Sequence, residues 1–224
     1  MNKEFFHLKN VGSEHIGDVL LKIQRSFNIK FDSNDLGYIV TFGDLCDVIQ
    51  NKINLEQEDS CTTQHAFYLL RNAIAATTGT DKCYITPHSR LAKLFPRESR
   101  LEAIADIEQE LGFKINLIQP KQWVIAIFSF TLVASFIAFF YNWPTALGIF
   151  LASVIGLKLA GKFGKEIRLK TVGDLANKIS RESYVKARRN PAVNRSEIEQ
   201  KVTELFTDEL TLKPAMVTRQ TTFR

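Results

Sequence analysis

The side chains best placed to do chemistry in this 224-residue chain are two aspartates, Asp44 and Asp174, at matching positions in two similar phrases. Paired carboxylates suit general acid–base catalysis when they share a site. Each of these, however, stands three residues after a threonine, Thr41 or Thr171. From the third position of a helix a carboxylate reaches back to the amide of the capping residue. Helix capping explains both aspartates, so the sequence predicts no catalytic residue.

Sulfur and imidazole groups do not form a recognisable site either. The cysteines, Cys46, Cys61 and Cys83, lack metal-site spacing and form no even set. Such a pattern is typical of a reduced, intracellular protein. The scattered histidines and the lack of a phosphate loop, a zinc signature or a nucleophile elbow exclude the common catalytic motifs. We expect a protein without enzymatic activity and without a metal ion.

The elements that carry these residues are helical. The phrase TFGDLCDVI at 41–49 matches TVGDLANKI at 171–179, and both have apolar residues at helical spacing. Longer amphipathic helices precede them at 16–27 and 101–111, and these end in the similar phrases FNIKF and LGFKI. A further helix is expected at 63–78, followed by a loop, ITPHSRLAKLFP. The fold class predicted is all-α, with enough apolar residues, 45%, for a core.

An uncharged stretch of 36 residues, 122–157, is too long for one membrane-crossing helix. It would measure about 54 Å as a helix, against a bilayer core of about 30 Å. Pro144 suits the start of a new helix, so we expect a transmembrane hairpin with spans at 123–141 and 145–163. A shallow re-entrant hairpin and a buried hairpin of a soluble domain are the alternatives. A stripe of small residues is expected to pack the second span against Ala134 and Ala138 of the first: Gly148, Ala152, Gly156 and Ala160.

The charges flank this hairpin unevenly. Residues 158–224 carry a net charge of +7, whereas the turn of the hairpin carries none. The positive-inside rule then places both termini in the cytoplasm, at the inner face of a cytoplasmic membrane. The basic segment 158–224 favours the lipid bilayer as a partner. Nucleic acid is not expected, because Arg188, Arg189 and their neighbours lack interleaved aromatic residues.

On these phrases the chain resembles the acyl carrier protein family, in which a phosphopantetheine arm is attached to a serine. That family has a first helix, an I-T-P-x-T-x-L loop, a D-S-L motif, an acidic second helix and a T-V-G-D-L helix. Residues 62–183 follow this order, with the hairpin at 123–163 inserted before the last helix. Residues 1–54 match only the second half of the pattern. The resemblance implies carrier-like helical bundles in a degenerate form.

The end of the chain holds the half that is missing from residues 1–54. Ser196 and Glu199 are expected to form a capping box, and apolar residues at 198, 202, 205, 206 and 210 share one helix face. The last residues, VTRQTTF, resemble the family's V-T-P-x-T-S-F loop. We therefore expect residues 195–224 to complete the module of residues 1–54 in permuted order. The alternative is a basic linker and an independent amphipathic tail helix in 184–224, bound to an anionic leaflet.

By the same resemblance, Ser13 and Ser99 stand where the family carries phosphopantetheine. Neither has the full D-S-L context, because Arg100 replaces the leucine after Ser99 and Glu14 follows Ser13. The alternative for both is an ordinary helix-capping serine.

The acidic helix 98–110 is the surface that the family offers to basic partner enzymes, with a solvated helix face as the alternative. The function expected is a membrane-anchored, non-enzymatic interaction module without a cofactor, and the alternative is a working acyl carrier with phosphopantetheine on Ser13 or Ser99.

Overall fold

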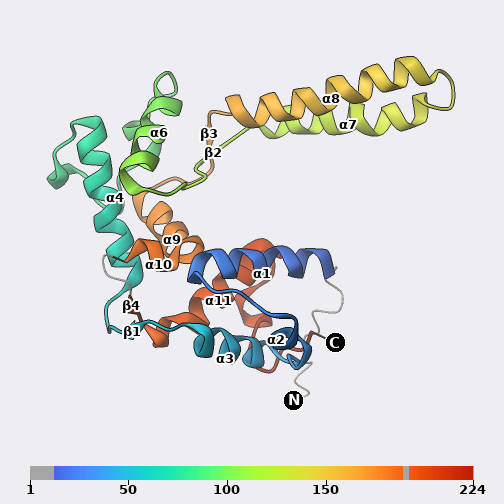
Figure 1. Ribbon diagram of the computed structural model, residues 1–224. Coiled ribbons are helices and arrows are strands. Elements are labelled where there is room, and N and C mark those ends of the chain that lie inside the picture. The colour runs from blue at the N-terminus through green and yellow to red at the C-terminus, as the bar shows by residue number, and fades with distance from the viewer. Residues whose placement is uncertain (1–12, 189–191, 224) are drawn as a thin grey trace. The chain divides into compact units, whose positions relative to one another are not determined.

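The computed structural model describes residues 13–188 and 192–223, and within them the protein is mostly helical, as predicted (Figure 1). The chain forms two compact units. One unit combines Met1–Asn72 with Gly173–Arg224, and the other is Ala73–Val172. These limits differ from the modules expected at 1–54 and 62–183, because helix α4 (Thr62–Thr78) crosses the first limit and α9 (Val172–Glu182) the second.

The first unit is built from both ends of the chain. Besides parts of α4 and α9, its described elements are α1 (Ser13–Phe27), α2 (Ser33–Gly37), α3 (Phe42–Lys52), β1 (Glu56–Gln57), α10 (Tyr184–Ala187), β4 (Ala192–Val193), α11 (Arg195–Glu209) and the 3-10 turn η3 (Pro214–Met216). The strands β1 and β4 pair in parallel.

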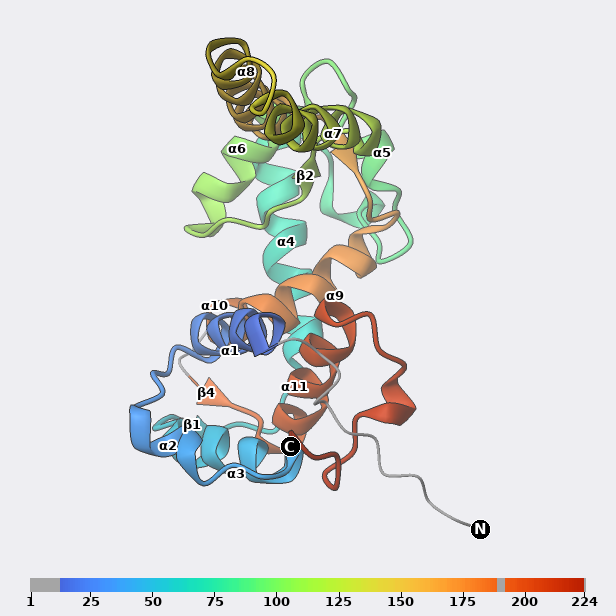
Figure 2. The ribbon, with the colours of Figure 1, turned by 90° about the vertical axis from the view of Figure 1, so that its right-hand side faces the viewer.

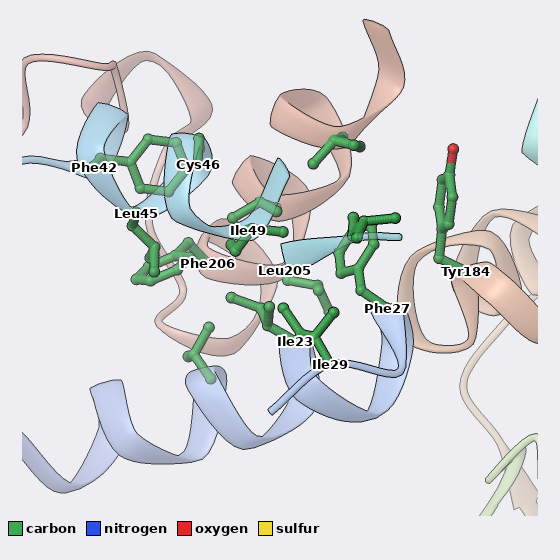
Figure 3. Close-up of a cluster of buried hydrophobic side chains, with 14 of the residues drawn as sticks. Ile23, Phe27, Ile29, Phe42, Leu45, Cys46, Ile49, Tyr184, Leu205 and Phe206 are labelled. Carbon is green, nitrogen blue, oxygen red and sulfur yellow. The ribbon is translucent and has the colours of Figure 1, made fainter. Parts of the chain in front are cut away.

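Helix α11 lies between α1 and α3 and supplies much of the core of the first unit (Figures 1 and 2). The Phe42 ring of α3 meets the Phe206 ring of α11 edge-on, with centroids 5.2 Å apart, and the Phe27 ring stacks on Tyr184 at 5.0 Å (Figure 3). The face expected on α11 is confirmed, because four of its side chains are fully buried: Ile198, Val202, Leu205 and Phe206. This face is inside the unit, so the structure does not leave it free for a leaflet.

The C-terminal segment forms a short bridge with the residues before α3. Thr222 pairs with Thr41, the Phe223 amide donates to the Val40 carbonyl, and the Phe42 amide donates to Thr221. The start of α3 is capped as predicted: the Thr41 hydroxyl accepts from the Asp44 amide, and the Asp44 carboxylate accepts from the Thr41 amide at 2.8 Å.

The capping box expected at Ser196 and Glu199 is wrong. Asn194 caps α11, and its side-chain oxygen accepts from the Ser196 amide at 3.1 Å. Glu199 instead binds Arg219 at 2.6 Å, and Asp47 binds the same guanidinium. A tertiary ion pair has taken the carboxylate that the local pattern assigned to the cap.

The second unit contains the rest of α4, η2 (Lys82–Tyr84), α5 (Leu91–Leu94), α6 (Arg100–Leu111), β2 (Ile118–Gln119), α7 (Gln122–Ala138), α8 (Trp143–Phe163) and β3 (Glu166–Ile167). Its buried side chains include Ile74, Ile85, Leu91, Phe95, Ile104 and Ile107. Strands β2 and β3 pair antiparallel. They hold together the point where α7 begins and the point where α8 ends.

Helices α7 and α8 lie side by side, with Pro144 in the first turn of α8 as predicted (Figure 1). The Thr131 and Ser153 hydroxyls are hydrogen-bonded at 2.9 Å, and the Phe136 ring meets the Phe150 ring. Among the described side chains of α8, these positions are buried or half-buried: Ala146, Phe150, Ser153, Val154, Gly156, Leu157 and Ala160. Most of them recur at steps of three and four residues, so one face of α8 forms the packing seam.

The small-residue stripe is therefore only partly at this seam. The ideal Cβ position of Gly156 lies 2.1 Å from the Phe128 ring of α7, so this glycine permits a close approach. Gly148 and Ala152 are exposed, and nothing lies within 4 Å of a Cβ at Gly148. Steps of exactly four residues advance about 40° around a helix each time, so the stripe turns from an exposed face at Gly148 and Ala152 onto the seam at Gly156 and Ala160.

One helix in the described part of the chain, at Trp143–Gly161 in α8, is long and apolar enough to cross a membrane. Helix α7 is also apolar but has 17 residues. Large apolar side chains on both helices face outward, including Phe130 of α7 at 75% exposure and Ile155 of α8 at 56%. A soluble core hairpin does not fit such exposure, since buried core helices cover their apolar side chains.

Candidate functional site

Ser99 lies in the second unit, in the turn that leads into α6. It is exposed and occupies the N-cap position, with its carbonyl accepting from the Ala103 amide at 2.9 Å. Its hydroxyl, however, makes no capping bond and has no other hydrogen-bond partner among the described residues. Ser99 is thus the N-cap residue of α6 by position, but its exposed side chain takes no part in the cap.

This serine opens onto a cleft of about 430 Å³ between the end of α4, the segment before α6 and α6 itself. Thr77, Thr78 and Thr80 line the α4 side, and Thr78 donates to the Ile74 carbonyl at 2.7 Å. Lys93 contributes the cation of the lining, opposite two carboxylates, Glu102 and Asp106. Pattern reasoning found Ser99 but not the cleft, because the threonines come from a helix that is distant in sequence.

Arg100, the residue after Ser99, has a structural role of its own. Its side chain is buried, its Nε donates to the Phe95 carbonyl at 3.0 Å, and a terminal nitrogen donates to the Lys165 carbonyl. The guanidinium thus ties the start of α6 to the segment before β3. It satisfies carbonyl groups that a leucine would leave unpaired.

The carboxylates of the acidic helix 98–110 divide into two kinds. Glu108 accepts from the Ile115 amide at 2.8 Å and closes the loop after α6, where Gly112 adopts a left-handed conformation. The others, Glu98 just before α6 and Glu102, Asp106 and Glu110 on it, are exposed and form no ion pair with any described residue. This set, which we call the acidic face of α6, carries charge that no fold contact uses.

Ser13 is the first residue of α1. Its side chain lies outside those that the structure describes, so phosphopantetheine attachment and helix capping both stay predictions for Ser13. Asp44 serves its capping box. Hydrogen bonds from the Thr41 and Val40 amides and from the Thr41 hydroxyl hold the pKa of Asp44 below its ordinary value. This carboxylate serves the helix cap, as the sequence predicted.

Two loops, one in each unit, make the same hydrogen bonds. In the loop after η2, the Thr86 amide donates to the Ser89 hydroxyl, and that hydroxyl donates to the Tyr84 carbonyl. In the loop after η3, the Thr218 amide donates to the Thr221 hydroxyl, which donates to the Met216 carbonyl.

Each loop then bridges to the start of a TxGDL helix with one register. Arg90 pairs with Thr171 as Thr222 pairs with Thr41. The Val172 amide donates to Ser89 as the Phe42 amide donates to Thr221.

A buried arginine is the feature that sequence analysis missed. Arg188 does not face a membrane: its side chain is 1% exposed. One terminal nitrogen donates to the Ser60 carbonyl and to the Thr62 hydroxyl (2.7 Å), and the other donates to the Glu58 carbonyl and the Ser60 hydroxyl (2.6 Å). Thr62 in turn donates to Glu197 at 2.7 Å. The network fixes the residues before α4 to α10 and α11.

The groups able to bind a metal are engaged elsewhere. Three carboxylates, Glu182, Asp208 and Glu209, lie within 4.8 Å of one another, but Lys178, Arg181 and Lys22 respectively pair with them. Burial raises the pKa of the Cys46 thiol to about 12, so this cysteine is a core residue rather than a nucleophile.

No protein-family model, curated protein or solved structure matches this chain.

Proposed function

We propose that this protein is a membrane-anchored, non-enzymatic, acyl-carrier-like protein that presents an interaction module at the cytoplasmic face. The observation that carries the proposal is the exposed apolar surface of α7 and α8. An apolar surface of this extent belongs in a bilayer or against a partner. In this proposal both helices span the bilayer, and the first span includes Phe139–Tyr141 beyond the end of α7. Both termini lie on the cytoplasmic side, where the positive-inside rule places the flanking basic residues.

The carrier-like character is supported by the equivalent loops. The same hydrogen bonds recur at 84–91 and 216–223, each bridged to a TxGDL helix start. We interpret the two loops as parts of two copies of one module. In the copy that contains the loop at 216–223, the two halves of the module occur in permuted order along the chain. The packing of α11 between α1 and α3 supports the permuted copy.

The partner surface in this proposal is the acidic face of α6. Its carboxylates have no ion-pair partner within the described chain, so a basic protein surface would be complementary to them and would be attracted to this face. The membrane tether raises the effective concentration of this face near other membrane proteins without any new contact.

Two experiments on the full chain test the proposal. Replacing residues 121–164 by a glycine–serine linker should move the protein from the carbonate-resistant membrane fraction to the soluble fraction. In the second experiment the hairpin is left intact, and a photo-cross-linking residue replaces Ala105, which is exposed on α6. This residue should give a discrete adduct in native membranes. That adduct should vanish when the acidic face is neutralised with Gln and Asn. Gln64, exposed on α4, is the control position.

If carbonate releases the intact chain from the membrane, the proposed anchor is wrong. If the Ala105 adduct persists after the acidic face of α6 is neutralised, the proposed partner surface is wrong.

The free hydroxyl of Ser99 at the mouth of the cleft favours a second candidate, a working carrier with phosphopantetheine on Ser99 or, in the first unit, on Ser13. The intact mass of the protein from its native membrane decides this. A phosphopantetheine mass that Ser99→Ala or Ser13→Ala abolishes would establish a carrier. An unmodified mass, with the transferase active on another carrier in the same cells, would exclude it.

A further inference from the structure

A second cleft lies at the base of the hairpin, where α7 begins and β3 ends. Its volume is about 760 Å³, and its lining comes from residues 119–123 and 166–168. The cleft is thus formed by the two chain segments that enter and leave the apolar hairpin. If the hairpin lies in a bilayer, this base lies at the level of the lipid headgroups.

The lining carries an excess of positive charge. Lys121 and Arg168 are exposed and form no ion pair with any described residue. The acidic residue of the lining, Glu166, is paired with Arg97 at 3.0 Å. Two cations therefore face the cleft without a balancing anion.

Trp123 gives the cleft its apolar wall and its depth in the membrane. It lines the cleft, is 60% exposed and belongs to the first turn of α7. Tryptophan concentrates at the headgroup level of bilayers, with its ring among the upper acyl carbons. The cleft thus joins an apolar wall to a guanidinium and an ammonium, and a guanidinium binds two phosphate oxygens at once.

We propose that this cleft binds the phosphate headgroup of an anionic phospholipid, with Arg168 and Lys121 on the phosphate and Trp123 against the acyl chains. The inference rests on the membrane anchoring proposed above. The cations are specific to this end, since the turn at the other end of the hairpin, residues 139–142, carries no charge.

The test uses the full chain in vesicles whose lipids carry bromine on the acyl chains, because bromine quenches a nearby tryptophan. Trp123 and Trp143 are the tryptophans of the chain, so Trp143→Phe leaves Trp123 as the reporter. Brominated phosphatidylglycerol is compared with brominated phosphatidylcholine at equal mole fraction in phosphatidylcholine. We expect a preference for the anionic lipid of about threefold, since each cation near an anionic headgroup contributes favourably.

The Lys121→Gln/Arg168→Gln double variant should abolish this preference. The matched control is Lys114→Gln/Lys170→Gln, which removes the same charge from exposed lysines outside the cleft and should retain it. Equal quenching by the two lipids in the unaltered cleft, or an equal loss in both double variants, overturns the proposal.

The remaining arms separate the alternatives. Trp123→Phe leaves Trp143 at the far turn, and quenching of Trp143 by both lipids reports insertion itself. If Trp143 is not quenched, the anchoring proposal fails; if it is quenched while Trp123 shows no preference, the cleft proposal alone fails. Inorganic phosphate should compete only at concentrations well above that of the vesicle lipid. Complete loss of the preference at a phosphate concentration below that of the lipid would assign the cleft to a soluble anion and overturn the lipid site.

Discussion

Arg188 carries a full charge into the interior of the first unit, where its terminal nitrogens donate to the carbonyl groups and hydroxyls of residues 58–62. Removing one partner of a buried charged network leaves the other polar groups without hydrogen bonds. Arg188→Met keeps the apolar stem and should cost about 3 kcal/mol of unfolding free energy.

Urea unfolding of the full chain in detergent, followed by circular dichroism, measures this cost. Lys186→Met on the same short helix is the control, because Lys186 is exposed. A loss for Arg188→Met no larger than for Lys186→Met would show that the network does not stabilise the unit.

Asp44 makes a prediction about pH. Its folded-state pKa lies below the ordinary 3.8, because the Thr41 and Val40 amides and the Thr41 hydroxyl donate to it. A lowered pKa gives stability that is present above the unfolded-state pKa and is lost as the pH falls through the folded-state pKa. Asp44→Asn should therefore cost about 1 kcal/mol at pH 7 and flatten the loss of stability below pH 5.

Unfolding midpoints at a series of pH values from 7 to 3 test this expectation. Asp18→Asn, an exposed position on α1, should leave the slope unchanged. An Asp44→Asn variant with the slope of the parent protein would rule out the capping carboxylate as its source.

Some side-chain roles could be predicted from the sequence, and others could not. The cap at Thr41 and Asp44 depends on positions three residues apart, so the pattern predicted it. Glu199 was assigned to a local cap but binds Arg219, because a tertiary partner competes for the same carboxylate. The burial of Arg188 was not predictable, because nothing in its neighbours in sequence indicates that residues 58–62 cover it.

At the scale of elements, helical periodicity predicted α1, α3, α4, α6, α9 and α11, whose long amphipathic faces are visible in the sequence. The two-residue strands were not predictable, because only a partner distant in sequence defines them. The predicted stripe of small residues is only partly at the seam of α8: Gly156 and Ala160 are half-buried, whereas Gly148 and Ala152 are exposed. The pair of helices α7 and α8 was predicted from the length of the uncharged stretch and the position of Pro144.

The ribbon of β2 and β3 depends on Gly164. An ideal Cβ at this position would lie 2.6 Å from the backbone at Gln119 and Pro120, and backbone atoms cannot move aside cheaply. Gly164→Ala should destabilise the second unit by about 2 kcal/mol. Gly161→Ala is the control, because nothing lies within 4 Å of its Cβ and alanine favours a helix.

Thermal unfolding in detergent and amide hydrogen exchange at 118–119 and 166–167 measure the effect. Faster exchange confined to Gly164→Ala is expected, and protection equal to that of Gly161→Ala would show that the ribbon tolerates a side chain.

At the scale of the whole molecule, the first unit joins residues that begin and end the chain. Loop closure over so long a separation costs entropy, and the core that α11 forms with α1 and α3 must repay it. A charge in the centre of this core should therefore loosen helices that are far from it in sequence. Val202→Asp places a carboxylate at a fully buried position of α11.

We expect Val202→Asp to raise amide hydrogen exchange throughout α1 and α3, because a buried unpaired carboxylate costs several kcal/mol and these helices share its core. Gln200→Asp changes an exposed position of the same helix and should leave both protected. Deleting 195–224 should reproduce the loss in α1 and α3. Retained protection of α1 and α3 in Val202→Asp and in the deletion would mean that the N-terminal helices fold without α11, and the permuted module would then be wrong.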